Sequence, residues 1–137
     1  MPYLVDSNVV IDHLMDVPEA SAILESLTAK GLAISIVTYM EAFQGIERSP
    51  DAKQAREKFQ AFTDGVLILP FSFAVAERCA RLRETLRTQK KRVNSRALDL
   101  IIAATALEYD ITLITKNTED FKDIPDLILY QPHERAL

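Results

Sequence analysis

The feature that most constrains the fold is the alternation of short apolar runs with longer helical segments. Four runs without helical spacing lie at residues 3–6, 32–37, 66–70 and 111–115, and a weaker one lies at 127–130. No two of them are joined by a hairpin signal. Strands that alternate with helices in this way form a parallel sheet covered on both faces. We therefore predict an α/β fold with a central parallel sheet of four or five strands flanked by helices.

Capping residues and apolar spacing predict the helices between these runs. They are expected at about 8–15, 18–30, 38–48, 50–64, 72–91 and 95–109. Ser7 is available as the cap of the first helix. The longest helix carries Val75, Cys79, Leu82 and Leu86 at steps of four, three and four, which is the core-facing stripe of a helix. We accordingly expect Cys79 to be a core residue.

The length of 137 residues is sufficient for one domain, so residues 1–137 are expected to form a single unit. The single cysteine rules out an intrachain disulfide. No stretch is long and apolar enough to span a membrane, and the acidic N-terminal segment is unlike a signal peptide. We therefore expect a cytoplasmic protein with no membrane partner.

The charge of the chain is unevenly distributed. The net charge is −4, but residues 78–96 hold eight basic residues and one acidic residue, a net charge of +7, so the rest of the chain carries −11. Such a basic segment is typical of polyanion docking through phosphates; the alternative is a solvated helix face. The RNA-binding candidates are Arg83, Arg87, Lys90, Lys91, Arg92 and Arg96.

Acidic and polar residues from distant parts of the chain are predicted to meet at one edge of the sheet. In an open parallel sheet, the functional crevice lies at the carboxyl ends of the strands. Several residues follow those ends or begin the helices beside them: Asp6, Glu41, Asp99, Thr115, Asn117 and Asp120.

Each acid also has a purely structural explanation. Asp6 would cap the helix that follows it, and Asp99 would pair with Arg96. Two further acids fit capping-box patterns, Thr38-x-x-Glu41 and Asn117-x-x-Asp120. Asp99 is the hardest to explain in this way because it interrupts an otherwise apolar segment, residues 97–107, and buried carboxylates are rare unless they are paired or bind a metal.

Taken together, the acids favour a metal site. Converging carboxylates repel one another unless a cation neutralises them. Oxygen ligands suit Mg²⁺ or Mn²⁺, and the sequence offers no cysteine–histidine set for zinc. Such a site suits phosphodiester hydrolysis. The only histidines, His13 and His133, are expected in a helix and near the chain end, which disfavours histidine-driven catalysis.

In this set of residues the chain resembles the PIN-domain ribonucleases, in particular the VapC-type toxins of bacterial toxin–antitoxin pairs. The likeness covers almost the whole chain. It rests on Asp6-Ser7-Asn8, on SIVTYMEAFQGI with Glu41, on LDLIIAATAL with Asp99, and on residues 115–121. One departure is Asn94-Ser95, where many relatives have a glycine.

The resemblance implies a PIN-like three-layer sandwich and a metal-dependent endoribonuclease that acts as a toxin on RNA. It implies Mg²⁺ or Mn²⁺ as cofactor, a homodimer, and a cognate antitoxin that blocks the pocket. The implied metal ligands are Asp6, Glu41 and Asp99, with Asp120 favoured over Asn117 as the fourth. Thr115 and Ser7 are implied as hydroxyls that orient a carboxylate or a water.

Two other functions are alternatives to a nuclease. A phospho-receiver domain needs an acceptor aspartate at the end of a middle strand, and neither LAISIV nor VLILP ends in one. A non-catalytic binding module would use the acids only as caps and ion pairs, and it would bind no divalent cation at the sheet edge.

Overall fold

The computed structural model of the chain describes residues 2–131. Four parallel strands form one sheet in the order β3-β2-β1-β4. Their bounds are Tyr3–Val5 (β1), Leu32–Ser35 (β2), Val66–Leu69 (β3) and Thr112–Ile114 (β4). At 127–130 the expected fifth strand is a single parallel bridge between Leu113 and Leu129. The predicted fold class is confirmed.

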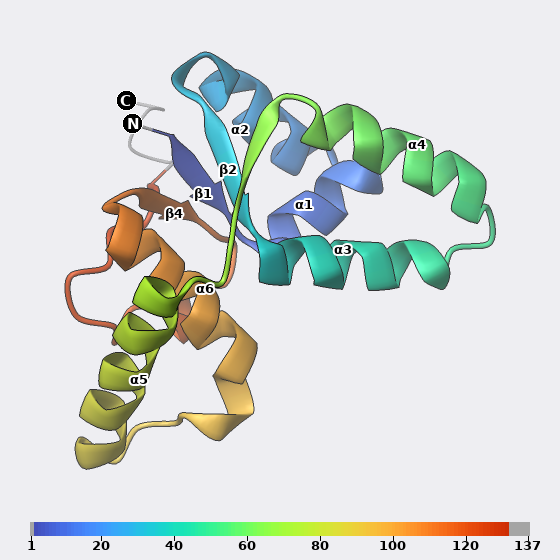
Figure 1. Cartoon of the computed structure of the whole chain (residues 1–137). Helices are drawn as coiled ribbons and strands as arrows, with labels where there is room; N and C mark the ends of the chain where they lie inside the picture. Colours follow the sequence, from blue (N-terminus) through green and yellow to red (C-terminus); the bar gives the residue numbers. More distant parts are fainter. Residues whose placement is uncertain (1, 132–137) are drawn as a thin grey trace.

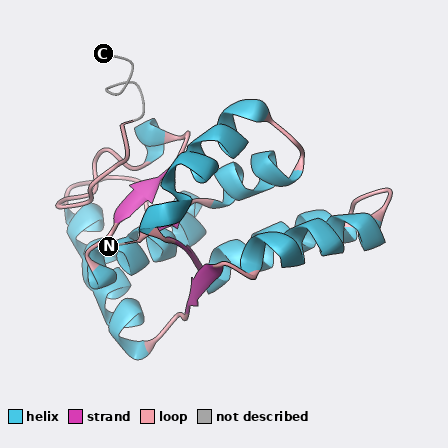
Figure 2. Ribbon diagram, turned by 90° about the horizontal axis from the view of Figure 1, so that it is seen from above, coloured by secondary structure: helices cyan, strands magenta, loops and turns pink. Residues whose placement is uncertain are grey.

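Six helices cover the two faces of the sheet, which makes three layers (Figure 1). Their bounds are Ser7–Leu14 (α1), Pro18–Leu27 (α2), Ile36–Glu47 (α3), Ala52–Thr63 (α4), Phe73–Thr88 (α5) and Ala97–Tyr109 (α6). Seen after a quarter turn, the strands lie between helices (Figure 2). Within the described part of the chain, no helix is both long and apolar enough to cross a membrane.

Alternation along each strand divides the core into two halves. Leu4, Ala33 and Leu113 pack with α5 and α6, whereas Val5 and Ile34 pack with α1 to α4. The predicted stripe on α5, including Cys79, is buried in the first half. Both faces of the central strands are therefore apolar, as expected for a buried parallel sheet.

Two helix starts differ from the prediction. Asp6, not Ser7, is the N-cap of α1, because its Oδ1 accepts the Ser7 backbone N–H, so the capping role considered for Asp6 is confirmed. The helix after β2 begins at Ile36 rather than Thr38, because the Ser35 hydroxyl accepts the Val37 N–H and ends the strand. The Thr38-x-x-Glu41 capping box is therefore not formed.

The strand order indicates where a ligand site is expected in this fold. The chain moves from β1 to β2 to β3 in one direction and then returns to add β4 on the other side of β1. The order therefore reverses between β1 and β4, and in an open parallel sheet the ligand site is expected at this reversal, outside the carboxyl ends of the strands. Asp6 and Thr115 are the residues that directly follow these two strands.

Candidate metal centre

Asp6 is fixed from two sides at this reversal point. It is 2% exposed. Its Oδ1 accepts the Ser7 N–H at 2.8 Å, and its Oδ2 accepts the Thr115 hydroxyl at 2.7 Å. The Thr115 hydroxyl oxygen in turn accepts the Asn117 backbone N–H at 3.0 Å. The carboxylate is thus held by the residues that follow β1 and β4, in a single orientation.

The surroundings of Asp6 do not neutralise its charge. Burial raises the pKa of the Asp6 carboxyl most, and the nearby carboxylates of Glu41 and Asp120 raise it further. The bonds from Thr115 and from the Ser7 backbone act in the opposite direction and do not cancel the rise. A positive charge placed at this point would therefore be stabilised.

Glu41 is brought to the site by a pair of hydroxyls rather than by a helix cap. The Ser7 hydroxyl donates to Glu41 Oε1 and lies 3.0 Å from the Thr38 Oγ1. Ser7 and Thr38 are both buried. One turn into α3, the Glu41 side chain is therefore oriented by the first residue of α1, next to Asp6.

Asp99 lies in the first turn of α6 and faces the same carboxylates. Burial raises the pKa of the Asp99 carboxyl to about 6, with further increases from Asp6, Glu41 and Asp120; Arg96 opposes them. The alternative Asp99–Arg96 ion pair is not formed, because the Arg96 guanidinium is bound to Asp123 at 2.7 and 2.8 Å. The burial of Asp99 is thus not explained by a salt bridge.

Asp120 completes the group from the turn that follows β4. It ends the 3-10 turn Thr118–Asp120, and its side chain is 45% exposed. Its Oδ1 lies 3.3 Å from the Arg92 Nη2. The Asn117 side chain makes no cap bond to this turn, so the second capping box is also wrong.

The carboxylate oxygens at the site are suitable ligands for a hard cation, but the side chains do not surround a common point. Among residues 2–131, no three acidic, histidine or cysteine side chains lie close enough together to enclose an ion. The four carboxylates are nonetheless electrostatically coupled, and they present only oxygen donors. Oxygen donors of this kind suit Mg²⁺ or Mn²⁺, which would also relieve the repulsion.

The histidine alternative gains no support from the described residues. The His13 ring nitrogen Nδ1 lies 2.8 Å from the Ser21 hydroxyl, and the ring packs against Phe62. These contacts lie among α1, α2 and α4. His133 lies outside the described residues.

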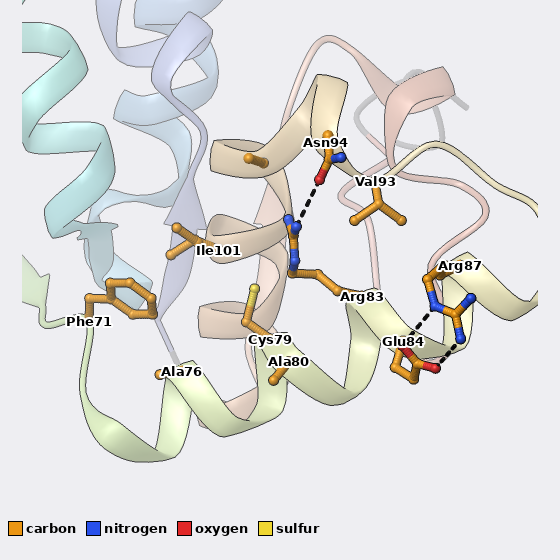
Figure 3. Close-up of a pocket in the computed structure, with 11 residues that line it drawn as sticks. Phe71, Ala76, Cys79, Ala80, Arg83, Glu84, Arg87, Val93, Asn94 and Ile101 are labelled. Carbon is orange, nitrogen blue, oxygen red and sulfur yellow. Dashed lines mark hydrogen bonds and ion pairs between the residues drawn. The ribbon is translucent and has the colours of Figure 1, made fainter.

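The basic segment borders a groove between α5 and α6 (Figure 3). The groove has a volume of about 560 Å³ and an apolar floor that includes Phe71 and Ile101. At the rim of the groove, Arg83 donates a hydrogen bond to the Asn94 side chain, and Arg87 forms a bidentate ion pair with Glu84 (Figure 3). The remaining candidates on this surface, Lys90, Lys91 and Arg92, are exposed.

The prediction that Arg96 contributes to an RNA-binding surface disagrees with its position. Arg96 is 5% exposed and its guanidinium is occupied by Asp123 and two backbone carbonyls. The run of basic residues suggested an exposed face, but Arg96 lies where the chain enters α6 and turns inward. It is therefore not part of the basic surface.

Two residues near the site were not proposed from the sequence. The sequence pattern suggests Thr38 only as a helix cap, yet its Oγ1 lies 3.0 Å from the Ser7 hydroxyl. Lys116 follows Thr115 and binds Asp12 at 2.7 Å. The available signals were a threonine in the first turn of the helix after β2 and a lysine two residues after the end of β4.

The chain is similar to known proteins over nearly its full length. The PIN-domain family model matches residues 3–127. Ribonuclease VapC2 of Rickettsia felis is 30% identical over 131 residues, covering 94% of this chain and 96% of the relative. Ribonuclease VapC1 of Haemophilus influenzae strain R2866 is 28% identical, with 93% and 95% covered.

Solved structures of related complexes share the fold. One is VapBC2 from Rickettsia felis bound to a promoter DNA fragment, with a TM-score of 0.85 at 29% identity, covering 95% of this chain and 98% of that one. Another is FitAcB from Neisseria gonorrhoeae, with a TM-score of 0.80 at 28% identity, covering 96% and 98%. The chain belongs to the PIN-domain family and is related to its VapC ribonucleases.

Proposed function

We propose that this protein is a Mg²⁺- or Mn²⁺-dependent endoribonuclease and the toxin of a type II toxin–antitoxin pair. Ribonucleases of this family generally depend on divalent metal ions. The observation that carries the proposal is Asp99: a carboxyl in the first turn of α6, coupled to three other carboxylates, with a pKa raised to about 6. Carboxylates grouped in this way are suited to a divalent cation, which would in turn neutralise the charge of a phosphodiester.

The proposed ligands are Asp6, Glu41 and Asp99, with Asp120 as the fourth. A bound cation supplies Lewis acidity and neutralises the charge that develops on the phosphodiester. Thr115 and the Ser7 N–H hold the Asp6 carboxylate in place, and the Ser7 hydroxyl orients Glu41. Because these bonds exist before substrate arrives, little rearrangement of Asp6 is needed.

The proposed reaction is hydrolysis at phosphorus. Water, rather than the ribose 2′-hydroxyl, is the nucleophile, and the products carry a 5′-phosphate and a 3′-hydroxyl. Exposed basic residues of the 83–92 segment are proposed to hold the RNA backbone, with no base specificity of their own.

The experiment incubates the purified chain with total cellular RNA and Mg²⁺ or Mn²⁺ and maps the cut ends. Asp99→Asn is expected to abolish cleavage while circular dichroism shows an intact fold. The matched control is Asp64→Asn, since Asp64 is exposed beyond α4 and outside the site. Full activity of Asp99→Asn would refute the proposal.

The partners are proposed from the relatives. The solved relatives include a toxin–antitoxin complex from Klebsiella pneumoniae, and we infer a cognate antitoxin for this chain. We also infer a cytoplasmic location, where such a toxin meets RNA. A homodimer is proposed because large apolar side chains are exposed on the segments that follow β2 and β3 and at the start of α6: Ile36, Met40, Phe71, Phe73 and Leu98.

A further inference from the structure

A buried positive charge lies directly beside the proposed site. Within residues 2–131, Arg96 is the one buried lysine or arginine. Removing a guanidinium from water costs free energy unless its N–H groups are bonded and its charge is paired. A buried guanidinium needs acceptors at fixed positions around it. The acceptors of Arg96 therefore indicate which segments it holds together.

The Arg96 guanidinium joins two segments that are distant in the sequence. Its Nη1 and Nη2 donate to the two carboxylate oxygens of Asp123 at 2.8 and 2.7 Å. Its Nε donates to the Arg92 carbonyl, and Nη1 also donates to the Asp120 carbonyl, both at 2.8 Å. Three of these bonds tie the segment before α6 to the turn after β4, and the fourth, to the Arg92 carbonyl, lies within the segment before α6. Only the planar fork of an arginine reaches these acceptors together.

The two segments carry two of the proposed metal ligands. Asp120 is held through its own carbonyl, so the backbone from which its carboxylate extends is fixed by Arg96. Asp99 lies three residues after Arg96, which is the residue that precedes α6. Phe121, which is 1% exposed, anchors the other side of the same turn in the core.

We propose that Arg96 and Asp123 form a positioning pair that holds the Asp120 turn at the distance from the start of α6 at which Asp99 and Asp120 bind one cation. The pair touches neither the RNA nor the ion. It sets the spacing of two ligands whose charges repel and would otherwise drive the turn away from α6. This role rests on the metal-dependent function proposed above.

The test changes the pair and measures metal affinity apart from activity. Asp123→Asn keeps the shape and removes the charge; Arg96→Lys keeps the charge and removes the fork. The control is Glu108→Gln, which breaks an exposed ion pair with Arg78 between α5 and α6. Mn²⁺ affinity is measured by calorimetry, and kcat and KM are measured on RNA.

We expect Asp123→Asn to weaken Mn²⁺ binding by about tenfold and to lower kcat by roughly ten- to a hundredfold, the range seen when groups that orient metal ligands are lost. The KM for RNA stays near the wild-type value, because the basic surface is untouched. Asp123→Glu restores part of the affinity, and Glu108→Gln behaves like the wild type.

Unchanged Mn²⁺ affinity in Asp123→Asn overturns the positioning role, and so does an equal loss in Glu108→Gln. If Arg96→Lys does not fold, Asp123→Asn alone decides. Asp99→Asn separates the two proposals. If Asp99→Asn abolishes Mn²⁺ binding and Asp123→Asn does not affect it, only the positioning pair fails. If Asp99→Asn binds Mn²⁺ normally, the metal site itself fails, and the positioning role fails with it.

Discussion

At the residue scale, Asp6 and Asp99 form no ion pair within residues 2–131, whereas Asp120 lies 3.3 Å from the Arg92 guanidinium. Thr115 and Ser7 satisfy the hydrogen-bonding capacity of Asp6 without supplying a positive charge. The one buried guanidinium nearby, Arg96, is paired with Asp123 instead. Burial and the neighbouring carboxylates therefore raise the pKa of Asp6 and of Asp99, and a bound cation would favour the ionised form of both.

The first prediction concerns stability without metal. The pKa of Asp99 rises from its ordinary value of 3.8 to about 6 on folding. The folded state therefore binds this proton more tightly, and the resulting stabilisation is complete below about pH 4 and lost as the pH rises through 6. The Asp99→Asn side chain carries no charge at any pH, so it avoids the cost of ionising Asp99 in the folded protein. In EDTA at pH 7.5 the variant should therefore have a higher free energy of unfolding than the wild type.

The size of the effect is on the order of 1 kcal/mol, because each pKa unit is worth about 1.4 kcal/mol and Asp99 is only half-buried. Urea unfolding at pH 4 and pH 7.5 measures it. A variant that is less stable than the wild type at pH 7.5, or a difference that does not change with pH, would contradict this assignment.

At the element scale, most of the fold was predictable from the sequence and most of the site geometry was not. Apolar runs and capping residues located every strand and helix to within a few residues. The start of α3 was misplaced because Ile36 and Val37 are β-branched and continue the strand pattern, whereas the Ser35 side chain ends the strand.

The contacts within the site depend on strand order, which local patterns do not encode. Thr115 meets Asp6 only because β4 pairs with β1, more than 100 residues earlier in the chain. Arg96 belongs to the same basic run as Arg92, yet it is buried because its position faces Asp123. Spacing along the chain alone predicts neither the contact between Thr115 and Asp6 nor the burial of Arg96.

The second prediction concerns the basic segment as a unit. Reversing two charges, Arg87→Glu with Lys90→Glu, should weaken RNA binding and flatten its dependence on salt, by about one unit of slope per lost phosphate contact. The control is Lys30→Glu with Lys53→Glu, which changes the net charge equally at exposed sites outside the segment. An unchanged slope, or an equal change in the control, would exclude the segment as the RNA-docking surface.

At the scale of the whole molecule, several of the exposed large apolar residues lie on the segments that follow β2 and β3. Met40 lies on α3, which contacts both β3 and α6, and Phe71 and Phe73 follow β3. Phe73 is 89% exposed. Soluble monomers rarely expose so many large apolar side chains together, so a second copy of the chain is the proposed occupant of this surface.

The third prediction follows from that surface. Light scattering coupled to size-exclusion chromatography should give a dimer for the wild-type chain without antitoxin. Phe73→Asp should shift it toward the monomer, whereas Met15→Asp, on an exposed residue at the end of α1, should not. A monomeric wild type, or a dimer unaffected by Phe73→Asp, would argue against this interface.

The central claim is that carboxylates from four parts of the chain hold one divalent cation at the point where the strand order reverses. A crystal structure in Mn²⁺ at pH 7.5 tests it most directly. We expect an anomalous peak ligated by Asp6, Glu41 and Asp99, with Asp120 moving in as the fourth ligand. Carboxylates that remain apart at saturating Mn²⁺, with no peak among them, would contradict it.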